Sequence, residues 1–216
     1  MSYLLLIFAL VHASLLAWTF RWPEGASAWL WLLRALLLGM VLDNSIQGLG
    51  QFFAESAALE GLNALRYYIH AAALPWLTLF GLSIMRRAGV SVASNRLLAG
   101  VFVLFTVSAV AWGLYHDGVM LELKPQDSYG VVKYVSTSKI PPIGTILTNV
   151  LLLGMGVAVW RAAGWPWLFA GSLFIFILNG ATGSQPWGFM VGNFAEVVFI
   201  TSLLATERHF GLSASR

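Results

Sequence analysis

Apolar residues in this chain occur in seven long runs separated by short polar segments. The runs cover roughly residues 3–20, 27–53, 62–85, 97–116, 141–160, 165–182 and 187–206. A helix needs about 20 apolar residues to cross the hydrocarbon core of a bilayer. Helices also satisfy their own backbone hydrogen bonds in lipid. The pattern therefore predicts one domain over residues 1–216, an all-α integral membrane protein built as a seven-transmembrane-helix bundle.

The longest polar segment, residues 117–140, lies between the fourth and fifth runs. It holds six charged side chains and the turn-like sequence Pro-Gln-Asp-Ser-Tyr-Gly. Proline, glycine, aspartate and serine favour turns. We therefore expect a loop here, on the outer side of the membrane.

Composition supports a membrane location. Hydrophobic residues make up 59% of the chain and charged residues 10%, and the mean hydropathy is +0.79. A soluble domain carries about 25% charged residues, so these values exclude soluble, disordered and coiled-coil classes. The chain has no cysteine, which excludes disulfides, thiolate metal sites, iron–sulfur clusters and haem attached through cysteine.

Lysine and arginine are unevenly divided between the two sides of the predicted bundle. Four lie on one side: Arg66, Lys124, Lys133 and Lys139. Eight lie on the other: Arg21, Arg34, Arg86, Arg87, Arg96, Arg161, Arg208 and Arg216. Cytoplasmic segments carry the excess of positive charge. We therefore expect an outside N-terminus and a cytoplasmic C-terminus, in an inner (plasma) membrane of bacterial type.

Polar residues inside the runs gather in the outer halves of the helices. At about 1.5 Å of rise per residue, the set falls at similar depth from different helices, and the cytoplasmic halves are almost bare of such groups. Intramembrane charges are costly and usually face the bundle interior. The sequence therefore predicts an outward-facing polar pocket formed by Asp43, Asn44, Gln47, Arg66, His70, Asn149, Asn179, Asn193 and Glu196.

Spacing brings several of these side chains together. Asp43 and Gln47 are four residues apart, as are Arg66 and His70, so each pair shares a helix face. The simplest neutral arrangement pairs Arg66 with either Asp43 or Glu196. The alternative for the asparagines is structural, because buried amides also hold helices together without any ligand. We expect His12, alone in the first run, to be a buried core residue.

Familiar catalytic motifs are absent. The sequence has no metalloprotease, serine-hydrolase, phosphate-loop or dinucleotide-binding signature. Its four histidines are scattered, so no metal site is predicted. No basic face supports nucleic-acid binding.

Two stretches resemble microbial rhodopsins. The sequence R-Y-Y-I-H-A-A-A-L-P-W-L is similar to the third helix of that family, with Pro75 nine residues after Arg66. The sequence N-F-A-E-V-V-F-I-T-S-L-L is similar to the last helix around the retinal-binding lysine, where this chain has Glu196. Ile69 takes the usual counter-ion position. The resemblance implies a shared architecture, but no lysine follows Lys139, so we expect no covalently bound retinal and no retinal photochemistry.

Three functions fit these patterns. The first is a protein whose pocket binds or conducts a small or amphipathic ligand or an ion. The second is an intramembrane enzyme that acts on a lipid or isoprenoid, with Asp43, Glu196 and His70 as acid–base groups. The third is an accessory subunit of a larger pigment or redox complex, with a non-covalent pigment or haem held by histidine. The expected partners are membrane lipid and a second copy or larger complex, not nucleic acid.

Overall fold

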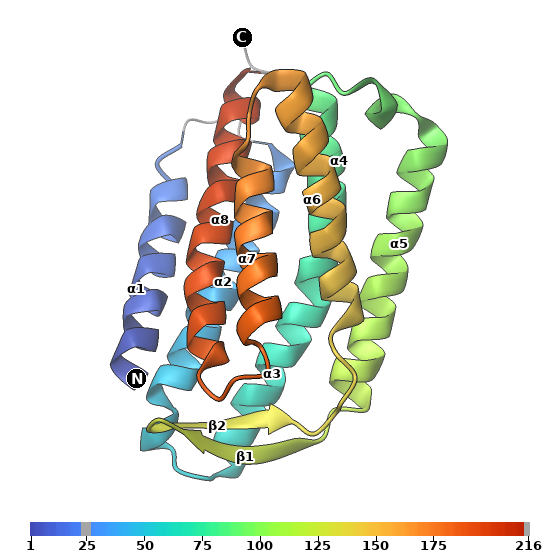
Figure 1. The fold of residues 1–216 in the computed structure, drawn as a ribbon. Helices are drawn as coiled ribbons and strands as arrows, with labels where there is room; N and C mark the ends of the chain where they lie inside the picture. Colours follow the sequence, from blue (N-terminus) through green and yellow to red (C-terminus); the bar gives the residue numbers. More distant parts are fainter. Residues whose placement is uncertain (23–26, 214–216) are drawn as a thin grey trace.

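The computed structural model describes residues 1–22 and 27–213, which form a bundle of α-helices (Figure 1). Its α-helices are α1 (Ser2–Thr19), α2 (Ala28–Leu49), α3 (Ala57–Ala73), α4 (Leu77–Arg87), α5 (Arg96–Leu114), α6 (Ile143–Ala163), α7 (Trp167–Thr182) and α8 (Gly188–Ser213). Among the described residues, six helical segments are long and apolar enough to cross a membrane. The helical, membrane-compatible architecture predicted from the sequence is therefore confirmed.

The third and sixth predicted runs differ in detail from the helices found. The third run is two helices, α3 and α4, joined by a 3-10 turn over Leu74–Trp76. Pro75 lies in this turn, and because proline has no N–H to donate, it interrupts the α-helical ladder. The sixth run is α7, which begins after Pro166 and has only 16 residues. At about 1.5 Å per residue it spans about 24 Å, less than a bilayer core of about 30 Å.

The two described ends of the chain lie at opposite ends of the bundle (Figure 1). We call the end that holds the start of α1 the hairpin end, after the β-hairpin described next, and the other the C-terminal end. At the C-terminal end, Arg21 follows α1, Arg96 begins α5, and the last turns of α4 and α6 hold Arg86, Arg87 and Arg161. Arg216, which belongs to the same predicted set, lies outside the described residues.

A β-hairpin occupies most of the segment expected to be a loop. Strand β1 (Leu123–Ser128) pairs antiparallel with β2 (Val131–Ser136). Tyr129 and Gly130 form the tight turn, with φ values of 56° and 75°. A two-residue turn with positive φ at both positions matches the twist of paired strands, and β2 is rich in valine, which favours strands. Residues 117–140 therefore connect two helices, as the sequence predicted, but the middle of the segment is a hairpin that the sequence did not predict.

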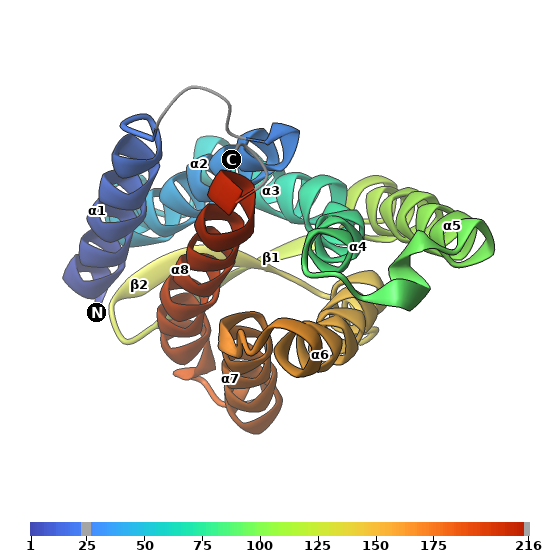
Figure 2. The same ribbon diagram turned by 90° about the horizontal axis from the view of Figure 1, so that it is seen from above.

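The hairpin lies across the hairpin end of the bundle (Figures 1 and 2). Val131 is fully buried in a cluster with Leu5 and Met190. Gly50, just after α2, allows the close approach of β2, because a Cβ there would lie 1.9 Å from the carbonyl oxygen of Val132. The hairpin is thus seated on α1, α2 and α8 rather than projecting from the bundle.

The main hydrophobic core fills the other half of the bundle. It joins α2, α4, α6 and α8 through fully buried side chains such as Leu37, Phe80, Leu152 and Leu203. These side chains pack closely together, so the interior toward the C-terminal end is filled mainly by apolar groups.

One ion pair is buried at the C-terminal end. The Arg87 guanidinium donates to both carboxylate oxygens of Glu207, at 2.6 and 3.1 Å, and the Ser27 hydroxyl donates to the same carboxylate at 2.5 Å. These bonds join α4, α8 and the start of α2. The sequence expectation that this half is almost bare of polar groups was wrong, because α8 continues beyond the predicted run and carries Glu207 into the interior.

Candidate functional site

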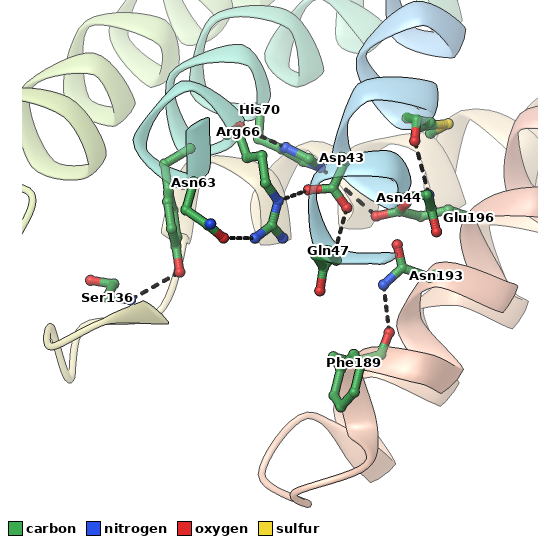
Figure 3. Close-up of polar contacts among 12 residues, drawn as sticks. Asp43, Asn44, Gln47, Asn63, Arg66, His70, Ser136, Phe189, Asn193 and Glu196 are labelled. Atoms are coloured by element: carbon green, nitrogen blue, oxygen red, sulfur yellow. Dashed lines mark hydrogen bonds and ion pairs between the residues drawn. The ribbon is translucent and has the colours of Figure 1, made fainter. Parts of the chain in front are cut away.

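Most of the polar residues predicted to meet do lie together, on α2, α3 and α8 at the hairpin end of the bundle (Figure 3). The centre of the group is an ion pair between Arg66 of α3 and Asp43 of α2. The Arg66 Nε–H donates to Asp43 Oδ1, and the Gln47 amide donates to Asp43 Oδ2 at 2.8 Å. Of the two carboxylates that the sequence offered to Arg66, the structure pairs it with Asp43.

Asn63 is a further hydrogen-bond partner of Arg66, and the sequence did not point to it. Its side-chain oxygen accepts a hydrogen bond from Arg66 Nη1 at 2.7 Å, and its own amide donates to the Leu59 carbonyl at 2.8 Å. Asn63 precedes Arg66 by three residues, so the two share a helix face. That spacing is the signal that could have identified it.

His70 and Glu196 form the second contact of the group. His70 Nδ1 lies 2.9 Å from the Arg66 carbonyl oxygen, which can only accept, so Nδ1 carries the proton. His70 Nε2 faces Glu196 Oε1 at 3.8 Å. Nε2 carries a proton only when the ring is charged, so the contact is an ion pair in one protonation state of the histidine and not in the other.

Two cavities adjoin this group and share one wall. The larger has a volume of about 580 Å³ and the smaller about 280 Å³, and both are lined by Asp43, Arg66, Tyr67 and His70. The Tyr67 hydroxyl accepts a hydrogen bond from the Ser136 amide at 2.9 Å, which ties this wall to the end of β2. The cavities therefore lie between the helices and the hairpin.

The larger cavity is amphipathic. Its lining includes the polar residues Ser136, Ser138 and Lys139 and the apolar residues Leu74 and Pro141. The smaller cavity lies toward α8 and is lined by Gln47, Lys133, Asn193 and Glu196, among others. A ligand of mixed polarity matches the first lining, whereas the second is mainly polar.

Lys133 belongs to the site although the sequence placed it in a loop. Strand β2 carries it into the interior, where its ammonium lies 3.4 Å from the ring centroid of Phe189. Burial, together with the nearby Arg66 charge, lowers the pKa of Lys133 to about 8, and the charge of Asp43 opposes this shift. The burial of Lys133 depends on how the hairpin packs against the helices, and the residues next to it in the sequence do not indicate this.

The remaining predicted residues differ in burial and in their distance from the two cavities. Asn44 is fully buried beside the group, and its amide donates to the Met40 carbonyl at 2.9 Å. Asn179 is exposed at the edge of the smaller cavity, and Asn149, on α6, lines neither of the two. His12 is fully buried, as expected of a core residue. Within residues 1–22 and 27–213, no three or more histidine, aspartate or glutamate side chains are grouped to hold a metal.

Comparison with known proteins adds no relative. The chain matches no protein family, no curated protein and no solved structure. Its function therefore has to be argued from the site itself.

The Asp43–Arg66 pair yields a first prediction. Removing one partner leaves the other charge buried and unpaired, which typically costs about 3–5 kcal/mol. We expect Asp43→Asn and Arg66→Gln each to lower the free energy of unfolding, and the double variant to lose less than their sum by about 1–3 kcal/mol. Unfolding in detergent measures this cycle.

The matched control pairs Arg66→Gln with Glu60→Gln, an exposed carboxylate on the same helix, and should be additive. A third cycle with Glu196→Gln tests the other pairing that the sequence allowed. Stronger coupling of Arg66 to Glu196 than to Asp43 would contradict the arrangement described.

Lys133 yields a second prediction, on pH. Its pKa is about 8 in the folded protein against 10.5 in the unfolded chain, so between these values the unfolded chain binds more protons. Stability should therefore rise with pH across this window, by up to about 1.4 kcal/mol per unit. We expect Lys133→Met to remove this rise. Lys124→Met, at an exposed position of β1, should keep it, and a wild-type profile without the rise would refute the burial of the amine.

Proposed function

We propose that seven segments, with α3 and α4 together as one of them, all cross an inner membrane of bacterial type, with the hairpin end outside and the C-terminus in the cytoplasm. The support is the distribution of arginine at the C-terminal end. The short helix α7 is apolar and flanked by Trp165 and Trp187, residues of the type that anchor helices at membrane interfaces. The architecture shared with microbial rhodopsins is part of this proposal.

We further propose that the protein binds a small amphipathic ligand in the cavities beneath the hairpin, without retinal photochemistry. The observation that carries this proposal is the shared wall of Asp43, Arg66, Tyr67 and His70, which faces two cavities from a buried, hydrogen-bonded network. A volume of about 580 Å³ lies within the usual range of ligand pockets. A lining that contains both polar and apolar groups suits a ligand with a polar head and an apolar body.

Binding is favoured over conduction by the closed core. The side chains of Leu37, Phe80 and Leu203 fill the interior on the C-terminal side of the site. A molecule that enters from the hairpin end meets these packed side chains within the described part of the chain. We therefore place both entry and exit of the ligand at the hairpin end.

An intramembrane enzyme acting on a lipid or isoprenoid is the second candidate. It is favoured by the contact of His70 Nε2 with Glu196 beside the cavity, since such a pair can pass a proton to a bound molecule. The same cavity serves both functions, and they differ in whether the retained molecule is chemically changed.

Orientation gives a third prediction. The chain has no cysteine, so single cysteines at Ser94, between α4 and α5, and at Tyr129, at the tip of the hairpin, report without background. Both positions are exposed. We expect a membrane-impermeant maleimide to label the Tyr129→Cys variant in intact cells and the Ser94→Cys variant only after lysis. Labelling of both positions from one side would contradict the topology.

Ligand retention gives a fourth prediction. Thr145 lines the larger cavity, whereas the next residue, Ile146, is exposed on the same turn of α6 and does not. We expect Thr145→Trp to fill the cavity and lose the molecule that copurifies with the wild type, and Ile146→Trp to keep it. Mass spectrometry of extracts from purified protein measures this. Equal retention by the two variants, or no bound molecule in the wild type, would count against the pocket.

A further inference from the structure

A serine, a histidine and an aspartate outside the polar group around Arg66 lie in hydrogen-bond contact with one another. His116 and Asp117 belong to the π-helical turn Tyr115–Val119 that follows α5. Ser138 lies in the segment between β2 and α6, which passes the same end of the bundle (Figure 1). Ser138 Oγ lies 3.2 Å from His116 Nε2, and His116 Nδ1 lies 2.7 Å from Asp117 Oδ1. These are the contacts of a Ser-His-Asp triad, which is recognised by its geometry rather than by sequence position.

The hydrogen bonds fix the proton positions that such a triad needs. A carboxylate only accepts hydrogen bonds, so His116 Nδ1 carries the proton that faces Asp117. Nε2 of the neutral ring then accepts, and the Ser138 hydroxyl donates to it. The Ile140 amide donates to Ser138 Oγ at 3.1 Å and adds a second contact that orients the hydroxyl. The serine oxygen therefore faces a base that can take its proton.

The histidine is fixed in place, whereas the serine is accessible. The side chains of His116 and Asp117 are 13% and 24% exposed. The His116 ring also stacks on Trp112, with the ring centroids 5.8 Å apart. Ser138, by contrast, is exposed. An oriented base beside an accessible hydroxyl is the arrangement that activates a serine as a nucleophile.

The larger cavity provides a place for a substrate beside this serine. It is lined by both Ser138 and Asp117, and also by the apolar residues Ile140 and Pro141. An apolar chain that lies in the cavity can therefore present a carbonyl group to Ser138. Lys139 follows the serine and lines the same cavity, so a positive charge is available for the oxyanion that forms when the carbonyl is attacked.

Depth in the membrane indicates which kind of bond is within reach. The apolar helical segment that contains α5 runs from Arg96 to Val119, so His116 and Asp117 lie at its last turn. On the topology proposed above, this turn lies at the outer interface, between the hydrocarbon core and the polar head groups. The ester bonds of lipids lie at this depth, and water is available there.

We propose that Ser138, His116 and Asp117 hydrolyse a fatty acyl ester whose chain lies in the larger cavity. Ser138 is the nucleophile, His116 the general acid and base, and Asp117 the residue that positions the histidine. This inference rests on the proposal that the larger cavity holds an amphipathic molecule, and it makes that molecule a carboxylic ester.

The reaction is complete with water as the second substrate. Ser138 Oγ attacks the carbonyl carbon and its proton passes to His116 Nε2. The bond between the carbonyl carbon and the alcohol oxygen then breaks, and His116 returns the proton to the departing alcohol. A water molecule attacks the acyl-serine in the same way, so the free acid leaves and Ser138 regains its proton. The net change is ester and water to acid and alcohol, with nothing oxidised or reduced.

The test, a fifth prediction, is labelling of the purified protein in detergent by a fluorophosphonate, with the label located by mass spectrometry. We expect a phosphonate on Ser138, because an activated serine forms the Oγ–P bond as fluoride leaves. His116→Gln removes the base and should slow this labelling by about 100-fold or more. Thr137→Ala is the matched control, because this neighbouring hydroxyl contacts Glu122 instead, and it should be labelled like the wild type.

Hydrolysis of 4-nitrophenyl palmitate tests the substrate class on the same samples. We expect wild-type turnover to fall to the uncatalysed rate in Ser138→Ala. Asp117→Asn should lower kcat by about 10³–10⁴-fold with little change in KM, because it acts through the histidine. Thr145→Trp should lose palmitate hydrolysis and still be labelled at Ser138, whereas Ile146→Trp should keep both.

The outcomes separate the triad from the cavity. An unlabelled Ser138 in the wild type, or equal labelling of His116→Gln, would overturn the triad and leave the cavity proposal standing. Undiminished palmitate hydrolysis in Thr145→Trp would overturn the place given to the acyl chain, although Ser138 would still be labelled. A labelled Ser138 without ester hydrolysis would overturn the substrate class. Labelling of the folded wild type needs no variant, so a variant that fails to fold does not hide the answer.

Discussion

The ion pair between Asp43 and Arg66 is the interaction on which the site depends. Charges at membrane depth are tolerated only when they are paired and hydrogen-bonded. Arg66 meets this condition with Asp43 and Asn63, and Asp43 with Arg66 and Gln47. These bonds fix α2 against α3 and orient His70 through the Arg66 carbonyl. Glu196 on α8 is then left facing a histidine rather than the arginine.

The hairpin and the core shape the space around this pair. Tyr67, the next residue after Arg66, holds the end of β2 through the Ser136 amide. The hairpin therefore depends on the same helix that carries the charge. On the C-terminal side, the pair of Arg87 with Glu207 joins α4 to α8, so the bundle is fastened by one buried ion pair toward each end.

The bundle could be predicted from the sequence because its signal, long apolar runs, is local. The grouping of Asp43, Gln47, Arg66, His70, Asn193 and Glu196 also followed from depth and spacing along single helices. What could not be read was relative rotation between helices, which decides that Arg66 meets Asp43 and that Asn149 stays apart. The burial of Lys133 could not be predicted for a similar reason. It depends on the strand register and on the close approach of β2 to Gly50, and both are set by residues far apart in the sequence. The burial of Glu207 was not predicted because the seventh apolar run ends at residue 206, whereas helix α8 continues to Ser213.

The packed core has a consequence for how the two ends of the bundle communicate. The cavities adjoin the hairpin, and side chains such as Leu37 and Phe80 fill the interior beyond them. On the topology and binding function proposed above, a bound molecule would therefore exchange with the outer side. Its binding would be felt at the opposite end only if it shifted helices such as α2 and α8, which run the length of the bundle.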